Sequence, residues 1–382
     1  MMFSEQERTA RLRLAKSLNV GPSTFVKLTS KYGSANSAIK YLSNHKSKYS
    51  EGICSLNNAA DELRQIEKLG GQLIFLGESL YPNALAMIAD PPPTISVLGN
   101  CQMIERLPSL NLFAVVGSRA CSYNSARFAY NLSQDLSAAD VTVVSGLARG
   151  IDTQAHRGGL ASKGSSIAVL ACGLDMPPYP PENKDLYFQL REQGLIVSEM
   201  PLGAAPQATL FPRRNRIIAG LARGTLVVEA ADRSGSLTTA RYALEYNRDV
   251  YAVPGFPLDP RCVGTNRLLK NGATLVESAA DILSNYPNLI RSSLPSDILE
   301  FEEPISVWNF PETNNTAVQA TDLGQVDNKS KILSILGANS IAVEDLVCEC
   351  CVPANELMAT LTELELDNKV KIENGQQVSL IM

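Results

Sequence analysis

The 382-residue sequence lacks the features that most quickly place a protein in a class. No apolar run reaches the roughly 18 residues that a membrane-spanning helix needs, and the acidic N-terminus has no hydrophobic signal-peptide core. Only two histidines occur, His45 and His156, and we expect His156 to be a structural residue on a helix. The eight cysteines are scattered, which favours free thiols in a reduced, cytoplasmic protein over a disulfide framework.

Basic residues are not in excess overall, because 34 Lys and Arg stand against 39 Asp and Glu, for a net charge of −5. This excludes a uniformly basic nucleic-acid binder but not a local basic patch. The net charge of successive segments is +3 for residues 1–106, +2 for 107–286, −6 for 287–327 and −4 for 328–382. No acid occurs in residues 106–134 or 200–228, and both windows hold arginines. If the two windows meet in the fold, they form an anion site.

From Leu112 onward, short apolar runs alternate with helical stretches. The runs are rich in β-branched residues and are expected as strands at 112–116, 141–144, 166–171, 195–197, 225–228, 250–253 and 274–276. Continuous apolar strands separated by helices predict a parallel sheet covered on both faces. We therefore predict an α/β fold with a Rossmann-like, doubly wound parallel sheet over residues 112–286, and ligands at the carboxyl ends of its strands.

The N-terminal part predicts a separate helical domain over residues 1–80. Two short helical stretches are joined by the turn Asn19-Val20-Gly21-Pro22, which is typical of a helix-hairpin-helix or SAM-like module. Residues 81–111 are rich in proline and turn residues, and we expect them to form a connector.

The C-terminal part predicts a linker and a small domain. Residues 287–327 contain four prolines, are acidic and lack periodicity, so we expect a linker. Residues 328–382 show three helical stretches followed by a β pair, which describes a winged helix (DML1-like) domain. Its third helix carries Glu356, Glu363 and Glu365 and no basic residue, so we expect protein contacts there rather than duplex DNA binding.

Turns of small residues follow the predicted strands and supply the candidate binding residues. Glycine lets backbone amides approach an anion, helix N-termini add positive potential, and Ser and Arg side chains add donors. The residues expected to contact a polyphosphate ligand are Gly117, Ser118, Arg119, Ser145, Gly146, Arg149, Gly150, Gly173, Phe211, Arg213, Arg214, Asn215, Arg216, Ser234, Gly235 and Ser236. We leave open that one arginine of residues 213–216 faces the core and pairs with an acid.

Common enzymatic motifs are absent from the sequence. There is no Gly-x-Gly-x-x-Gly after Val116, no complete P-loop and no Gly-x-Ser-x-Gly elbow. The cysteines at 348, 350 and 351 lack the spacing of a zinc site. We therefore expect no catalytic residue, no bound metal and no cofactor.

Several ordered motifs resemble those of the DprA/Smf family of DNA-processing proteins, and the resemblance extends over essentially the whole chain. They include Val116-Gly117-Ser118-Arg119, Ser145-Gly146-Leu147-Ala148-Arg149-Gly150-Ile151-Asp152, Cys172-Gly173-Leu174-Asp175, Phe211-Pro212-Arg213-Arg214-Asn215-Arg216 and Ser234-Gly235-Ser236-Leu237. The resemblance implies a protein that binds and protects single-stranded DNA and loads the recombinase RecA onto it during natural transformation. It also implies a homodimer formed through the Rossmann-like domain, with no membrane partner.

The residue types agree with a single-stranded ligand, which needs a positive path for its phosphates and rings on which its bases stack. Candidate stacking residues beside the loops are Phe211, Tyr179, Tyr123 and Phe256. One alternative is a nucleotide-processing enzyme similar to nucleoside monophosphate phosphoribohydrolases, but residues 233–240 have Ala where that group carries a Glu. A structural hub for recombination proteins is the second alternative.

Overall fold

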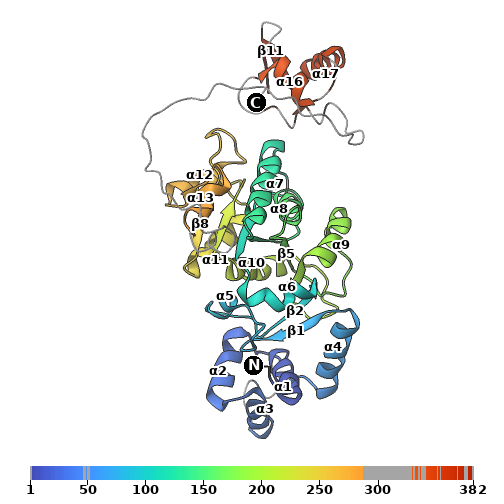
Figure 1. Cartoon of the computed structure of the whole chain (residues 1–382), viewed down its shortest axis with the longest axis vertical. Coiled ribbons are helices and arrows are strands. Elements are labelled where there is room, and N and C mark those ends of the chain that lie inside the picture. Colours follow the sequence, from blue (N-terminus) through green and yellow to red (C-terminus); the bar gives the residue numbers. More distant parts are fainter. Residues whose placement is uncertain are drawn as a thin grey trace, which may run out of the picture. The chain divides into compact units, whose positions relative to one another are not determined.

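The chain folds as two units, Met1–Leu289 and Ile290–Met382 (Figure 1). The computed structural model describes residues 2–45, 49, 52–286, 329, 332–333, 336, 341–350, 352, 354–367, 369–373 and 377–380. No helix within these ranges is both long enough and apolar enough to cross a membrane.

A nine-stranded sheet organises the first unit. In spatial order its strands are β1 (Gln72–Phe75), β2 (Thr94–Gly99), β6 (Leu195–Ser198), β5 (Ser166–Leu170), β4 (Thr142–Ser145), β3 (Leu112–Val116), β7 (Gly224–Val227), β8 (Asp249–Ala252) and β9 (Thr274–Leu275). All pairs from β6 to β9 are parallel, whereas β2 pairs antiparallel with both β1 and β6. The chain winds outward from β3 to β6, then returns to β7 beside β3 and winds the other way. This order confirms the predicted doubly wound fold and puts its switch point between β3 and β7.

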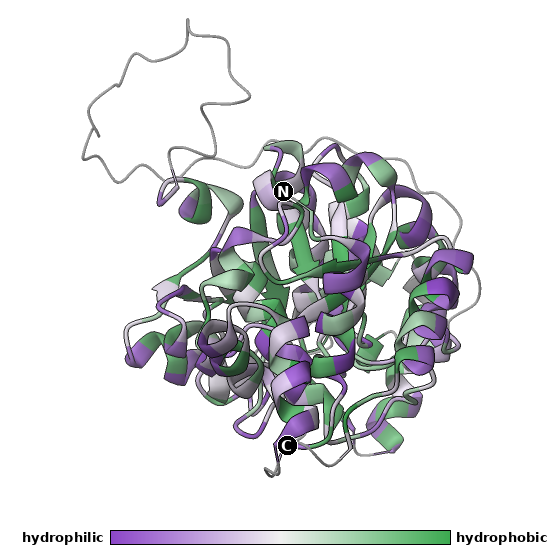
Figure 2. Cartoon of the chain, turned by 90° about the horizontal axis from the view of Figure 1, so that it is seen from below, coloured by the Kyte–Doolittle hydropathy of each residue, from purple (hydrophilic) through white to green (hydrophobic). Residues whose placement is uncertain are grey.

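Helices cover both faces of this sheet. They include α7 (Tyr123–Ala138), α8 (Ile151–Leu160), α9 (Lys184–Gln193) and α13 (Ala279–Leu283) on one face and α10 (Leu210–Leu221) and α11 (Ser236–Glu245) on the other. Every residue of β3 is buried, and its side chains alternate, so that Phe113 packs toward α7 while Ala114 packs toward α10. The strands are accordingly mostly hydrophobic in Figure 2, where the helices alternate between hydrophobic and hydrophilic.

Four helices form an N-terminal module in this unit. They are α1 (Glu5–Ala15), α2 (Pro22–Tyr32), α3 (Ala35–Asn44) and α4 (Leu56–Lys68). Phe25 and Leu14 are fully buried in its core. Gly33 ends α2 with φ +76°, a conformation that glycine adopts without strain, and the Ser34 hydroxyl then caps α3 by accepting from the Ser37 amide. Arg8 ties the module to the sheet because its guanidinium donates to the Leu73 carbonyl at 2.8 Å.

Residues 81–111, expected to be a connector, instead contribute to the sheet. They contain α5 (Asn83–Ala86), β2, α6 (Cys101–Arg106) and a short 3-10 helix (Leu107–Ser109). Ile95 and Val97 of β2 are fully buried. The prolines at 91–93 stop immediately before β2, where the missing amide hydrogens cost no strand pairing. The sheet therefore begins at Gln72, inside the segment predicted to be helical.

The second unit contains the predicted winged-helix hairpin. Its described elements are β10 (Ile341–Ala342), α16 (Val343–Cys350), α17 (Ala354–Leu366), β11 (Val370–Glu373) and β12 (Gln377–Leu380). The strands form an antiparallel sheet in the order β10, β12, β11. Leu357, Leu361 and Leu364 of α17 are fully buried against them. The linker predicted at 287–327 lies outside the described residues.

A buried histidine fixes the backbone after β4. His156 on α8 is fully buried; its Nε2 accepts from the Leu147 amide at 3.2 Å, so its Nδ1 carries the hydrogen and donates to Ser166 Oγ at 2.8 Å. Ser166 Oγ donates in turn to the Val143 carbonyl. Burial, helped by the charge of Arg214, lowers the pKa of His156 to about 3. The histidine is therefore neutral in the folded protein.

We predict that His156 makes the fold acid-sensitive. The unfolded chain protonates this imidazole near its ordinary pKa of 6.5, whereas the folded protein resists protonation down to about pH 3. The unfolded state therefore binds more protons in that window, and the stability present above pH 6.5 is lost as the pH falls. The contribution approaches about 1.4 kcal/mol per pH unit. In His156→Gln, which retains a donor and an acceptor, the urea-unfolding free energy should fall less steeply between about pH 6 and pH 4. Equal slopes in both proteins would contradict this role.

Candidate nucleic-acid interface

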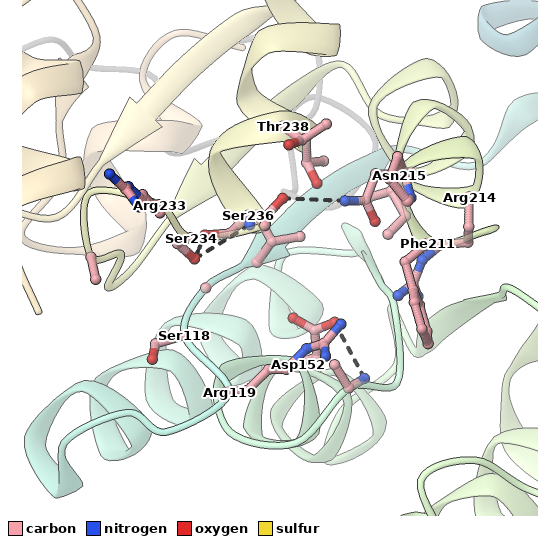
Figure 3. A pocket seen from close by; sticks show the side chains of 18 of the residues that line it. Ser118, Arg119, Asp152, Phe211, Arg214, Asn215, Arg233, Ser234, Ser236 and Thr238 are labelled. Carbon is pink, nitrogen blue, oxygen red and sulfur yellow. Dashed lines mark hydrogen bonds between the residues drawn. The ribbon is translucent and has the colours of Figure 1, made fainter. Parts of the chain in front are cut away.

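A pocket of about 710 Å³ lies at the switch point, outside the carboxyl ends of β3 and β7 (Figure 3). Its walls are the loops that follow these two strands and the first turns of α10 and α11. The predicted residues that line it are Gly117, Ser118, Arg119, Phe211, Arg214, Asn215, Ser234, Gly235 and Ser236. The two acid-free windows thus meet, because Arg119 comes from the first and Arg214 from the second.

The loop after β3 is held in place by neighbouring backbone. The Ser118 amide donates to the Glu229 carbonyl at 2.7 Å, and the Ser118 carbonyl accepts from the Ile151 amide at 3.1 Å. The buried Glu229 carboxylate accepts from the Ser122 amide and, at 2.7 Å, from its hydroxyl. At Gly117 a Cβ would lie 2.6 Å from Ile151 Cγ1, so no side chain fits. The loop therefore presents Arg119 from a fixed backbone.

Arg119 is exposed and forms no ion pair with any residue that the structure describes. Its guanidinium carbon lies 5.1 Å from the centre of the Phe211 ring, and that of Arg214 lies 5.9 Å from it. The ring of Tyr179 is 6.2 Å from that of Phe211. A cation beside an aromatic ring is stabilised without being neutralised, so the charge of Arg119 stays available for a phosphate.

Arg214 lines the pocket but is buried, at 5% exposure. Its Nη1 donates to the carbonyls of Gly146 and, at 2.7 Å, Val169. Asp152 balances its charge and accepts from the amides of Gly146 at 3.0 Å and Ala148 at 3.4 Å. Burial raises the pKa of Asp152 and lowers the pKa of Arg214. The charge of Arg214 opposes the first shift, and the charge of Asp152 opposes the second. The pair therefore fixes the loop after β4.

Two further predicted residues serve this loop. Ser145 is fully buried, and its hydroxyl donates to the Val115 carbonyl at 2.7 Å. Gly150 has φ +76° and is the N-cap residue directly before α8; a Cβ there would clash with the Ser118 carbonyl oxygen. Both residues set the distance between the loops after β3 and β4, and neither lines the pocket.

The opposite wall is the start of α11. Ser234 and Ser236 share a hydrogen bond between their hydroxyls at 2.8 Å, and Asn215 donates to the Gly235 carbonyl at 3.2 Å. Gly235 at the N-cap of α11 has no side chain, and the Ser236 amide donates to Ser234 Oγ at 3.4 Å. The start of α11, which carries positive potential, lines the pocket. Arg233 lines the same wall and is exposed. This wall supplies donors and positive potential for an anion.

The remaining predicted residues lie elsewhere. Gly146 and Arg149 border a small neighbouring cavity, where Arg149 pairs with Glu182 at 3.6 Å. Gly173 packs under a covering loop, since its amide donates to the Ala204 carbonyl at 2.9 Å. Arg213 is exposed and borders a separate cavity of about 390 Å³.

Arg216 is corrected from a binding residue to a core residue. It is 4% exposed, pairs with Glu199, and places its Nε 3.5 Å from Asp90 Oδ2. Two arginines of residues 213–216, Arg214 and Arg216, are therefore buried, whereas the sequence suggests that at most one faces the core. The physical reason is that the run forms the first turns of α10, whose successive side chains point in different directions around the helix.

Sequence reasoning missed several lining residues. Arg233 directly precedes the Ser-Gly-Ser turn, so its position in the motif was an available signal. Asp152 also lines the pocket. Nothing in the sequence indicated that position, because a carboxylate repels an anionic ligand. The candidate stackers Tyr123 and Phe256 are exposed and do not line the pocket. Within the described ranges, no three His, Cys, Asp or Glu side chains cluster to hold a metal.

Comparison with protein families gives three matches along the chain. The sequence profile of DNA recombination-mediator protein A matches residues 72–287, that of the DprA-like N-terminal HHH domain matches residues 5–64, and that of the DprA winged helix domain matches residues 319–376. The first covers more than half of the chain.

Individual relatives agree with these matches. Protein Smf of Synechocystis is 35% identical over 307 residues, which cover 78% of this chain and 77% of that protein. The crystal structure of DprA from Streptococcus pneumoniae has a TM-score of 0.63 at 33% identity, and covers 74% of this chain and 98% of that one. DprA from Helicobacter pylori, whose structure describes a single-stranded DNA binding mode, has a TM-score of 0.51 at 27% identity, and covers 57% and 96%. The chain therefore belongs to the DprA/Smf family of DNA recombination-mediator proteins.

Proposed function

We propose that this protein binds single-stranded DNA in the switch-point pocket, protects it, and loads the recombinase RecA onto it during natural transformation. The observation that carries the proposal is the Arg119 guanidinium, held beside the Phe211 ring at 5.1 Å with no ion pair among the described residues. A free cation next to a ring suits a ligand that offers both phosphates and unpaired bases. The single-stranded DNA binding described for the Helicobacter pylori relative supports it.

The pocket favours a single strand over a duplex for a physical reason. In a duplex the faces of the bases are stacked on one another, and only their edges are accessible from the grooves. Phe211 lines the pocket, and the ring of Tyr179, 6.2 Å from it, borders the neighbouring small cavity. Aromatic rings can stack only on bases that have been separated from a partner strand. The hydroxyls of Ser234 and Ser236 and the start of α11 then take the phosphate.

We propose that the protein is not an enzyme of the phosphoribohydrolase type. Ala240, at the position where that group carries a Glu, is fully buried on α11 and offers no functional group. The winged-helix unit is assigned to protein contacts, because Glu356, Glu363 and Glu365 are exposed on α17 and repel a DNA backbone.

We also propose that two copies of the chain associate through the β9 edge of the sheet. Both residues of β9 are exposed, and one side of this strand has no partner strand among the described residues. Four large apolar side chains in β9 and in the segment that precedes it in sequence are exposed by 40–71%: Phe256, Leu258, Val263 and Leu275. An unpaired strand edge with an exposed apolar side chain, here Leu275, is a surface that a second copy can cover.

Arg119→Ala should weaken binding of a single-stranded oligonucleotide roughly tenfold, the effect of losing one charged hydrogen bond. If about four phosphates are contacted, the log–log slope of affinity against salt is about −3, and it should become shallower by about 0.7 in the variant. Fluorescence anisotropy at several salt concentrations measures both quantities.

The matched control is Arg157→Ala, which removes an exposed arginine from the last turn of α8, away from the pocket lining. It should leave the affinity and the salt slope near those of the unaltered protein. If Arg119→Ala folds normally and behaves like this control, Arg119 is not a phosphate contact.

Arg216→Ala should lower the free energy of unfolding by about 3–5 kcal/mol, because it leaves the buried Glu199 carboxylate without its partner. Arg213→Ala, three positions earlier on the same helix and exposed, should change it by no more than about 0.5 kcal/mol. Urea denaturation compares the two proteins. Similar losses of stability in both would show that the burial difference between these arginines does not decide their roles.

Leu275→Asp should convert the dimer to a monomer, because it places a charge on the apolar edge around β9. Light scattering gives the mass of each protein in solution. A matched change at an exposed apolar residue of the N-terminal module, Leu56→Asp, should leave the mass unchanged. A Leu275→Asp protein that keeps the mass of two copies would place the dimer contact elsewhere.

A further inference from the structure

The longest stretch of the chain without an acid lies in the N-terminal module. No Asp or Glu occurs between Glu7 and Glu51, and this stretch contains nine Lys and Arg. It is longer than either of the two acid-free windows that meet at the switch-point pocket. Clustered cations produce a positive local potential even where the net charge of the whole protein is negative. The module therefore carries positive charge that the pocket does not use.

The cations of α1 and of its C-cap already have partners within the first unit. The partners are Glu78 for Arg8, Glu7 for Arg11, the Cys54 carbonyl for Arg13 and Glu62 for Lys16. All four of these basic residues are only partly exposed. Their charges serve the packing of the module and are not offered to a ligand.

The lysines of α2 and α3 are different. Lys27, Lys31 and Lys40 are exposed, and none of them forms an ion pair with a residue that the structure describes. Lys27 and Lys31 are one helical turn apart on the same side of α2. The two helices pack side by side in the module (Figure 1). We call these three residues the α2–α3 lysine surface.

A stack of rings joins the two helices at this surface. The Lys31 Nζ lies 5.3 Å from the centre of the Tyr32 ring, and that ring stacks on Tyr41 of α3 at 4.6 Å. Tyr41, which directly follows Lys40, stacks in turn on His45 at 4.0 Å. Two stacked neighbours occupy both faces of the Tyr41 ring, although its side chain is 40% exposed. Tyr41 can therefore offer a hydroxyl to a ligand but no face to a base.

Cations without an open ring face suit a nucleic acid that presents phosphates and keeps its bases stacked. Duplex DNA has this form, and it carries one negative charge per roughly 1.7 Å of its axis. Each phosphate that is neutralised contributes about 0.9 to the salt slope on a duplex, compared with about 0.7 on a single strand. Lys and Tyr side chains are among the groups that contact DNA phosphates, and such contacts carry no sequence information.

We propose that the α2–α3 lysine surface binds the backbone of duplex DNA without reading its sequence. Lys27, Lys31 and Lys40 neutralise phosphates, and Tyr41 adds a hydroxyl donor. None of these residues lines the switch-point pocket, so the surface is a second site rather than an extension of the first. The inference goes beyond the proposed function, because it gives the protein a contact for duplex DNA in addition to its site for a single strand.

The test measures the affinity of the full-length protein for a short labelled duplex by fluorescence anisotropy at several salt concentrations. Three neutralised phosphates contribute a log–log slope of about −2.7, so raising the salt from about 50 mM to about 200 mM should weaken binding about 40-fold. Replacing Lys27, Lys31 and Lys40 together by Ala should make the slope shallower by about 2.7. Ala also favours the helix at exposed positions, so this triple variant should fold. Arg at the same three positions keeps the charges and should keep the slope.

The matched control replaces three exposed lysines that are scattered over the same unit, Lys68, Lys163 and Lys184, by Ala. It removes the same charge from the protein and should leave the slope for duplex DNA unchanged. An unchanged slope in the Lys27, Lys31 and Lys40 variant would overturn the inference and would leave the surface to another anion, such as an acidic protein segment. Equal losses in the control and in this variant would also overturn it, because only the overall charge would then matter.

Arg119→Ala separates the two sites. It should weaken the binding of a single-stranded oligonucleotide and leave duplex binding near that of the unaltered protein. The triple alanine variant of the α2–α3 lysine surface should show the opposite pattern with a single strand short enough to fit the pocket alone. If Arg119→Ala does not weaken single-strand binding, the proposed function fails while the duplex site stands. If the unaltered protein does not bind the duplex even at the lowest salt concentration, the duplex site fails while the proposed function stands.

Discussion

The buried positive charge of Arg214 is the constraint on which the rest of the site depends. A guanidinium at 5% exposure needs acceptors and a nearby negative charge, and it finds them in the carbonyls of Gly146 and Val169 and in Asp152. Asp152 is thereby fixed and holds the loop after β4 through two amides. Gly150 lets that loop approach the loop after β3, whose backbone carries Arg119. One buried charge thus orders the loop after β4 and, through Gly150, the neighbouring loop that carries the exposed Arg119.

The sequence specifies the central fold because buried parallel strands are continuous apolar runs. The run at 112–116 coincides with β3, and the repeated strand–turn–helix rhythm leaves few alternatives to a doubly wound sheet. The strands β1 and β2 escaped prediction because three prolines directly precede β2, and because both strands lie outside the repeated strand–turn–helix rhythm and pair antiparallel. The candidate site was predictable where motifs follow strands. The prediction of lining residues failed at Gly173. This residue follows β5 in the same way, but residues 201–204 cover it, and no local sequence pattern encodes that contact. The prediction failed again at Arg216, because only packing decides which side of α10 faces the core.

The charge distribution explains how an acidic protein presents a positive site. The net charge of −10 carried by residues 287–382 lies outside the segment that forms the pocket, and the pocket lining holds three arginines against one aspartate. Of these arginines, Arg214 is balanced by Asp152, while Arg119 and Arg233 are exposed. Local geometry rather than overall composition therefore sets the sign of the potential that a ligand meets.

The pairing of β2 with β6 has a consequence for how the protein folds during its synthesis. Ser96 and Ser198 lie opposite each other in the sheet but are 102 residues apart in the chain. At a synthesis rate of about 5–20 residues per second, the ribosome needs about 5–20 s to add the residues between them. During that time β2, with Ile95 and Val97, has emerged without the strand that will cover its second edge. The nascent chain therefore passes through a stage in which this apolar strand edge is open.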